Sequence, residues 1–260
     1  GMPAGEGRDA TLIVEEVPGF GVLLPSNLVP LPLVDPGRRA LLAYTGFSPR
    51  DPSDALLAMQ RAETLDDFDQ AISGVSTLGF NFIAATPEGI TYRVGLDVPN
   101  RGTPSTMQAP YLIMNGDNAD AFWTGDMLPL DMLPHSRAPE RGFLYSANND
   151  PFGFTHDGDV HNDPWYYGGL FAPGLRARRI DQELTRLTAR GGVTLQDMRA
   201  LQTDTRSQFA DYLLPTLQAA LNAAAEDPTL SESLSEDGER VARLLLEEWD
   251  REMVRDSSGA

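Results

Sequence analysis

Length, composition and charge place this chain among ordinary globular proteins and exclude several functional classes. It has 260 residues, of which 41% are hydrophobic and 22% charged, enough apolar material for a large core. Its net charge of −18 repels nucleic-acid phosphates and anionic lipids, and no apolar run approaches the roughly 18 residues of a membrane helix. We therefore expect neither a nucleic acid nor a membrane as partner. Cysteine is absent and all 20 basic residues are arginine, which excludes thiol and lysine chemistry.

The N-terminal part of the chain combines short strand patterns with short helix patterns. Three apolar runs predict strands: residues 11–14, 21–24 and 40–44. Pro18 and Gly19 predict a turn between the first two runs. Two short helices follow, for which Ser53 and Thr64 are the predicted N-cap residues.

The clearest local signal is a β-hairpin in the middle of the chain. Residues 78–85 and 90–95 are rich in aromatic and β-branched side chains. They are separated by Thr-Pro-Glu-Gly, in which proline presets one turn angle and glycine accepts a positive φ. From residue 97 to residue 163 the chain is crowded with Pro, Gly, Asn and Asp, which predicts a long irregular region of the kind that often carries functional sites.

The last part of the chain has helical periodicity. Apolar residues recur at helical spacing at Ile180, Leu184 and Leu187, and Thr194 is placed to cap a helix over residues 195–201. Two further helices are predicted: residues 209–225 and 241–254.

Together these patterns predict an α+β fold with antiparallel strands. We expect a single domain over residues 1–260, β-rich over residues 10–150 and helical over residues 174–256. The irregular region lies between the strands and the helices.

The residues by themselves leave several functional hypotheses open. No serine lies in a G-x-S-x-G turn and no histidine in an H-E-x-x-H helix, which argues against two common hydrolase types. The loop from His156 to Asp163 is either a calcium site or a solvated acidic loop. Asn148 follows an apolar run and presents an amide that can donate to an oxyanion, although Asn-Asn-Asp-Pro is also an ordinary turn. Arg176 orients that amide or a substrate carboxylate, or else forms a surface ion pair.

A series of short motifs resembles one known family when the motifs are taken in order. They are the hairpin of residues 81–95, Pro99 and Arg101, Trp123-Thr-Gly125, Leu133-Pro134, residues 142–149 with their Ala-Asn-Asn, Arg176 to Ile180, Leu201 to Asp204, and Trp249-Asp250. In this order they resemble the β subunit of the penicillin acylase (penicillin amidase) family of N-terminal nucleophile hydrolases. The resemblance runs from about residue 12 to residue 256, but it corresponds only to a middle portion of the family's precursor.

The resemblance implies part of an αββα sandwich and a hydrolase that cleaves linear acyl amides. Asn148 matches the family's oxyanion asparagine, and Arg176 matches the arginine that supports it. Asp163 is the nearest candidate for a ligand of the family's structural calcium, and the resemblance suggests no other cofactor.

The resemblance also implies that the chain does not carry the family's nucleophile. That nucleophile is a serine at the free N-terminus of the β subunit, and neither Gly1 nor Met2 can take its place. We therefore expect the chain to be inactive alone, and either to need the missing nucleophile-bearing segment or to self-associate through open sheet edges. Because family members act after export, the parent protein is expected to be periplasmic or secreted.

Three alternatives stand beside the amidase hypothesis. The chain is a non-enzymatic scaffold or binding module, or half of a split enzyme from a truncated gene, or a calcium-dependent binding protein that uses the Asp157 to Asp163 loop.

Overall fold

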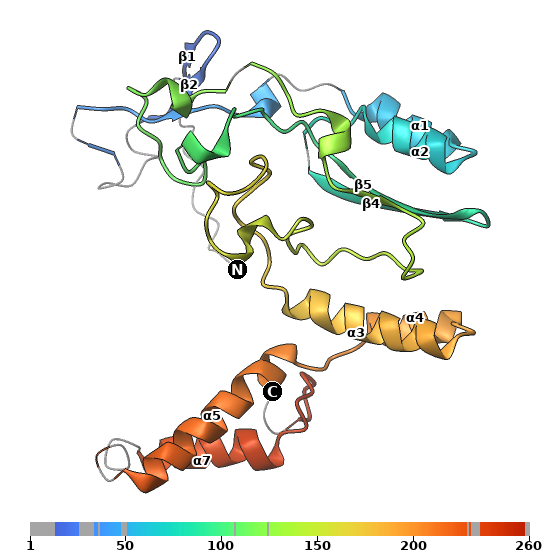
Figure 1. The fold of residues 1–260 in the computed structure, drawn as a ribbon, viewed down its shortest axis with the longest axis vertical. Coiled ribbons are helices and arrows are strands. Elements are labelled where there is room, and N and C mark those ends of the chain that lie inside the picture. Colours follow the sequence, from blue (N-terminus) through green and yellow to red (C-terminus); the bar gives the residue numbers. More distant parts are fainter. Residues whose placement is uncertain are drawn as a thin grey trace, which may run out of the picture. The chain divides into compact units, whose positions relative to one another are not determined.

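The protein forms two compact units. The computed structural model describes residues 14–25, 34–35, 37–47, 51–77, 79–106, 108–123, 125–227, 229 and 235–257. The first unit comprises Gly1–Ala138 and Asp150–Phe171, and the second comprises Pro139–Asn149 and Ala172–Ala260. Figure 1 shows the helices and strands of both. Among the residues placed by the structure, none of the helices has the length and hydrophobicity needed to span a membrane.

The first unit begins with a small antiparallel sheet in the order β1-β2-β3. Its strands are β1 (Glu15–Val17), β2 (Gly21–Leu23) and β3 (Leu41–Leu42). The predicted turn is confirmed, since the Phe20 N–H donates to the Val17 carbonyl at 3.0 Å and Gly19 has a φ of +80°. The strand predicted at residues 11–14 lies largely outside the described residues, and the strand that enters the turn is β1.

The predicted hairpin is confirmed and forms the second sheet of this unit. Strand β4 (Phe80–Thr86) pairs antiparallel with β5 (Gly89–Gly95), and Thr86 lies opposite Gly89, so the connection has only Pro87 and Glu88. Strand β6 (His135–Arg137) pairs with the other edge of β5. It falls inside the region predicted to be irregular, because three residues are too few to give a periodic signal.

Helices α1 (Ser53–Arg61) and α2 (Leu65–Ile72) precede the hairpin. The predicted cap at Thr64 is confirmed by a capping box, in which Thr64 Oγ1 accepts from the Asp67 N–H and Asp67 accepts from the Thr64 N–H. The predicted cap at Ser53 is wrong. Ser53 is the first helical residue, and the N-cap is Pro52, which makes no side-chain capping hydrogen bond. The Ser53 N–H donates to Asp51 Oδ1 at 2.9 Å.

The core of the first unit lies where α2 packs on β5. Ile72 and Val75 are buried, with 0% and 3% of their surface exposed. A Cβ atom at Gly95 would lie 2.9 Å from both the Phe82 ring of β4 and the Val75 side chain, and 3.1 Å from Ile72 at the end of α2. A glycine at this position therefore permits the contact between helix and sheet.

The part of the long irregular region that belongs to the first unit packs a core of its own. Val98, Leu128 and Leu133 are buried together, and the Phe152 ring meets the Trp165 ring edge-on at 5.5 Å. Short 3-10 turns interrupt the first unit: η1 (Thr45–Phe47), η2 (Pro104–Thr106), η3 (Ala119–Ala121), η4 (Leu130–Met132) and η5 (Phe154–His156). Packing against apolar side chains explains how a segment with little regular secondary structure stays ordered.

The second unit is helical, as predicted. Its helices are α3 (Leu175–Arg190), α4 (Leu195–Gln202), α5 (Gln208–Glu226) and α7 (Glu236–Arg243), followed by a π-helical turn, η6 (Leu244–Glu248). Leu184 and Leu187 of α3 are buried, and Thr194 caps α4 in a second capping box with Asp197. Helices in this unit and antiparallel sheets in the first confirm the α+β class.

The predicted helix at residues 241–254 is wrong in its boundaries. Helix starts earlier, where Ser235 caps α7, and it ends with η6 at Glu248. Beyond that point the Ser207 N–H donates to the Arg251 carbonyl at 2.8 Å. Because the backbone after η6 pairs with the residues that precede α5, tertiary hydrogen bonds replace the helical ones there.

Candidate functional site

The structure brings Asn148 and Arg176, two of the three site residues predicted from the sequence, into direct contact. Both belong to the second unit. Arg176 Nη2 donates to the side-chain Oδ1 of Asn148 at 2.9 Å and to the Ala147 carbonyl at 2.9 Å. One guanidinium therefore holds the asparagine side chain and the backbone beside it.

The backbone of Asn148 is fixed as well. Its φ of +59° lies in the left-handed region, which asparagine tolerates better than most residues with a side chain. Its carbonyl accepts a hydrogen bond from the Ala172 N–H at 2.7 Å. Asn148 is thus pinned to the segment that leads into α3, while the preceding residue, Ala147, is only 3% exposed.

The contact with Arg176 determines which way the Asn148 amide faces. A guanidinium has only donors, so the atom turned toward it must be the carbonyl oxygen Oδ1. The Nδ2 group is then directed away from Arg176, and Asn148 is exposed. Every hydrogen bond we find to Asn148 within the described residues is accepted by an oxygen. The site therefore offers an oriented N–H donor.

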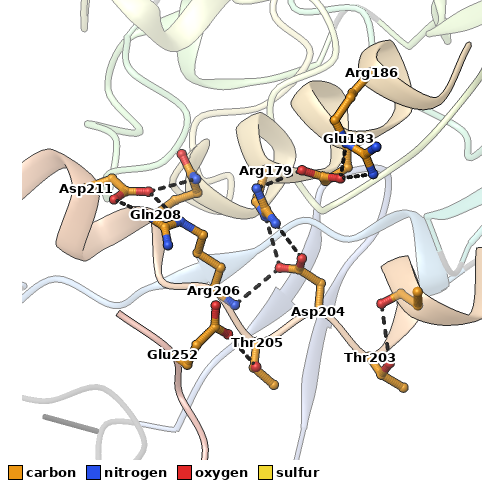
Figure 2. A network of polar contacts seen from close by, with 11 residues as sticks. Arg179, Glu183, Arg186, Thr203, Asp204, Thr205, Arg206, Gln208, Asp211 and Glu252 are labelled. Atoms are coloured by element: carbon orange, nitrogen blue, oxygen red, sulfur yellow. Dashed lines mark hydrogen bonds and ion pairs between the residues drawn. The ribbon is translucent and has the colours of Figure 1, made fainter. Parts of the chain in front are cut away.

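Arg176 lies in the first turn of α3, and that helix is held in place by ion pairs. Figure 2 shows this network. Arg179, one turn along α3, makes two hydrogen bonds to Asp204, Nε to Oδ1 at 3.0 Å and Nη2 to Oδ2 at 2.6 Å. It also pairs with Glu183 at 2.9 Å. The hydrogen bonds from Arg179 lower the pKa of Asp204.

A second group of ion pairs holds the start of α5. Asp211 Oδ1 accepts from Arg206 at 2.9 Å and from Arg251 at 2.7 Å. Burial opposes ionisation of Asp211, but the hydrogen bonds from the two arginines outweigh it and lower its pKa. Thr205 donates to Glu252 at 2.7 Å. Side-chain contacts thus join α5 to the extended segment after η6.

Comparison with known proteins decides the family. The family profile described as penicillin amidase matches residues 16–260. The chain belongs to the penicillin amidase family. Among solved structures, a thermostable penicillin G acylase from Alcaligenes faecalis resembles this amidase-family chain with a TM-score of 0.51 and 19% sequence identity, over 77% of this chain and 33% of that one. The chain thus spans about a third of that acylase, and at this identity the likeness concerns the fold.

Asp163, the predicted calcium ligand, lies in an acidic loop of the first unit of this amidase-family chain. Burial, followed by repulsion from the charges of Asp157, Asp150 and Asp159, raises its pKa. Asp157 is instead hydrogen-bonded to Asn162 at 2.7 Å. Within the described ranges no three His, Cys, Asp or Glu side chains gather closely enough to hold a metal. The calcium ligand therefore stays a prediction.

No pattern in the sequence predicts the ion pair between Arg179 and Asp204. Both residues lie in motifs on which the family resemblance rests, but their 25-residue separation has no periodicity that would link them. Only the packing of the helices brings them together. The sequence feature nearest to a signal for this pair is the absence of lysine. Every basic side chain is an arginine, whose forked donors can make two hydrogen bonds to one carboxylate.

Proposed function

We propose that this chain supplies the oxyanion-stabilising amide of an amidohydrolase that cleaves linear acyl amides. In this proposal Asn148 Nδ2 donates to the oxygen that becomes negatively charged when a nucleophile attacks the amide carbonyl. Arg176 acts as a positioning residue, because it binds Oδ1 of the same side chain. The observation that carries the proposal is the 2.9 Å hydrogen bond between Arg176 and Asn148, in a chain of the penicillin amidase family.

The chemistry follows from where charge develops during the reaction. Attack on the amide carbonyl places a full negative charge on its oxygen, and a donor already in position stabilises that charge without reorganising. The positive charge of Arg176 adds to this effect, since withdrawing electron density from Oδ1 makes the Nδ2 hydrogens better donors. Both the fixed backbone and the fixed side chain of Asn148 therefore favour the tetrahedral intermediate over the planar substrate.

In this proposal the nucleophile lies in another part of the complete enzyme. The chain spans about a third of the related acylase, and we infer that the nucleophile comes from the remainder, so that the chain by itself does not turn over substrate. We further infer that the sheet of β4, β5 and β6 is one part of an αββα sandwich, completed by strands of that remainder. Support for both inferences comes from family membership.

The test compares Asn148→Ala with wild type in the complete enzyme that contains this chain, using a chromogenic acyl anilide. We expect kcat to fall about 100- to 1000-fold, as for loss of one oxyanion donor elsewhere, with KM little changed. Asn222→Ala on α5 is the matched control, because it removes an exposed amide from another helix and should leave kcat unchanged. Equal loss in both variants, or none in Asn148→Ala, would refute the role of Asn148.

The isolated chain provides a second test, of where the nucleophile lies. It is expected to release no product above the uncatalysed rate. Hydrolysis by the isolated chain that Asn148→Ala abolishes would show that the chain carries its own nucleophile, while leaving the role of Asn148 intact.

A further inference from the structure

A groove lies in the second unit, beside the segment that carries Asn148. It has a volume of about 770 Å³ and is lined by residues 144–145, by α3, by α4 and by the start of α5. Three of its apolar side chains are exposed, with Leu195 at 68%, Met198 at 41% and Phe209 at 56%. Exposed apolar side chains that gather in one concave surface mark a binding site more often than isolated ones do.

Positively charged side chains outnumber negatively charged ones in the lining of the groove. Its lining contains four arginines and one carboxylate: Arg176, Arg179, Arg199, Arg206 and Asp204. Arg179 is paired with Asp204, and Arg206 with Asp211. Arg176 donates to neutral oxygens, and among the described residues we find no carboxylate paired with Arg199. Two uncompensated positive charges therefore face a groove in a chain whose net charge is −18.

We propose that this groove binds a small anionic amphiphile, namely a carboxylate that carries an alkyl chain. The alkyl chain would pack on Leu195, Met198 and Phe209, and the carboxylate would pair with Arg199. A volume of about 770 Å³ is within the range of about 300–1000 Å³ typical of sites for single small molecules. The surplus of guanidinium groups favours an anion over a cation, because in this lining an added cation would meet like charge.

Binding in this groove is independent of the proposed hydrolysis and is measured on the 260-residue chain itself. Dodecanoate below its micelle concentration is titrated at pH 7 in a calorimeter. We expect saturable binding of one molecule, and binding at least about tenfold weaker for acetate, which lacks the chain, and for dodecyltrimethylammonium, which inverts the charge. Equal affinity for dodecyltrimethylammonium, or no saturable binding of dodecanoate, overturns the proposal.

Two variants locate the site. Arg199→Gln removes the proposed carboxylate partner and should weaken dodecanoate binding about tenfold. Met198→Asp places a negative charge on a side chain that is 41% exposed, so it should abolish binding while the melting temperature stays close to wild type. Arg178→Gln is the matched control, since Arg178 is exposed on α3 and does not line the groove; it makes the same change in net charge and should bind as wild type.

The other class of occupant is a polypeptide. If dodecanoate binds equally to wild type and to both groove variants, the groove is not its site and the proposal fails. If Met198→Asp instead converts a self-associating chain into a monomer in sedimentation, with no dodecanoate binding to wild type, the groove is a protein interface and the proposal also fails.

Discussion

Replacing Asp204 by asparagine removes one charge from the ion pair that links α3 to the segment before α5. Arg179 and Asp204 make two hydrogen bonds, at 3.0 and 2.6 Å, and their side chains are only 21% and 20% exposed. Asparagine has nearly the same shape, so it leaves the packing intact and keeps one acceptor oxygen for Arg179. The substitution therefore removes the charge of the carboxylate and one of its two hydrogen bonds to Arg179.

The cost of Asp204→Asn can be bounded from these contacts. A hydrogen bond to a charged group contributes about 1.5–3 kcal/mol, and breaking a fully buried ion pair costs about 3–5 kcal/mol. Here asparagine retains one of the two bonds and Arg179 retains Glu183 at 2.9 Å. We therefore expect a loss of about 1–2 kcal/mol, which lowers Tm by several degrees at about 2–4 °C per kcal/mol.

The effect of Asp204→Asn should depend on pH, with a sign fixed by the lowered pKa of Asp204. Since Arg179 holds that pKa below its ordinary value of 3.8, the unfolded chain takes up the proton at a higher pH than the folded one does. The stabilisation is therefore complete above about pH 5 and is lost as the pH falls through the lowered pKa. Wild type and Asp204→Asn should differ most at pH 7 and converge below about pH 4.

Thermal unfolding followed by circular dichroism at pH 7 and pH 3 measures the loss of stability in Asp204→Asn and its dependence on pH. Asp237→Asn is the control, because Asp237 pairs with Arg240 on α7 but is 88% exposed, and it should change the unfolding free energy by less than about 0.5 kcal/mol. If Asp204→Asn has no effect at pH 7, or the same effect at both pH values, the ion pair does not hold α3 as argued.

Three further substitutions test other parts of the structure. Thr194→Ala removes the capping box of α4 and should lower the free energy of urea unfolding by about 1 kcal/mol; an unchanged midpoint would contradict the cap. Gly95→Ala places a Cβ atom 2.9 Å from the Phe82 ring and the Val75 side chain, so it should destabilise the chain by about 1–3 kcal/mol in the same assay, and a neutral result would show that these two side chains can move. Arg176→Ala in the complete enzyme should lower kcat less than Asn148→Ala does, because the amide remains but is no longer oriented; a larger loss would give Arg176 a direct role in the chemistry.

The features that could be predicted from the sequence are those fixed by neighbouring residues. The cap at Thr64 depends on Asp67, three residues away, and the β4-β5 hairpin depends on a two-residue connection. The same local reasoning failed at Ser53, because Pro52 is the N-cap and Ser53 is already helical. Its N–H donates to the carboxylate of Asp51, a contact that the serine pattern does not predict. At the C-terminus the helical period continues through Trp249, but pairing with residues 205–207 takes over the backbone there.

The candidate site depends on contacts between residues that are far apart in the sequence, which local patterns do not predict. Asn148 and Arg176 are separated by 28 residues, so no local pattern brings them together. The residues by themselves leave their roles open, and only the ordered motifs of a family favour the oxyanion role. Arg179 and Asp204 lie in those motifs too, but their contact depends on how α3 packs beside α4 and α5, which no spacing encodes. Nothing in residues 144–209 predicted a groove, because concavity arises only when the helices are assembled.

The left-handed backbone of Asn148 has a consequence for saturation mutagenesis at this position. At a φ of +59°, glycine is relaxed, asparagine and aspartate are tolerated, and β-branched residues are strained. A library ranked by expression or protease resistance should therefore place glycine at or near the top. The same library ranked by turnover should place glycine near the bottom, because it has no amide to offer. Two selections on one codon would thus separate what this residue does for folding from what it does for chemistry.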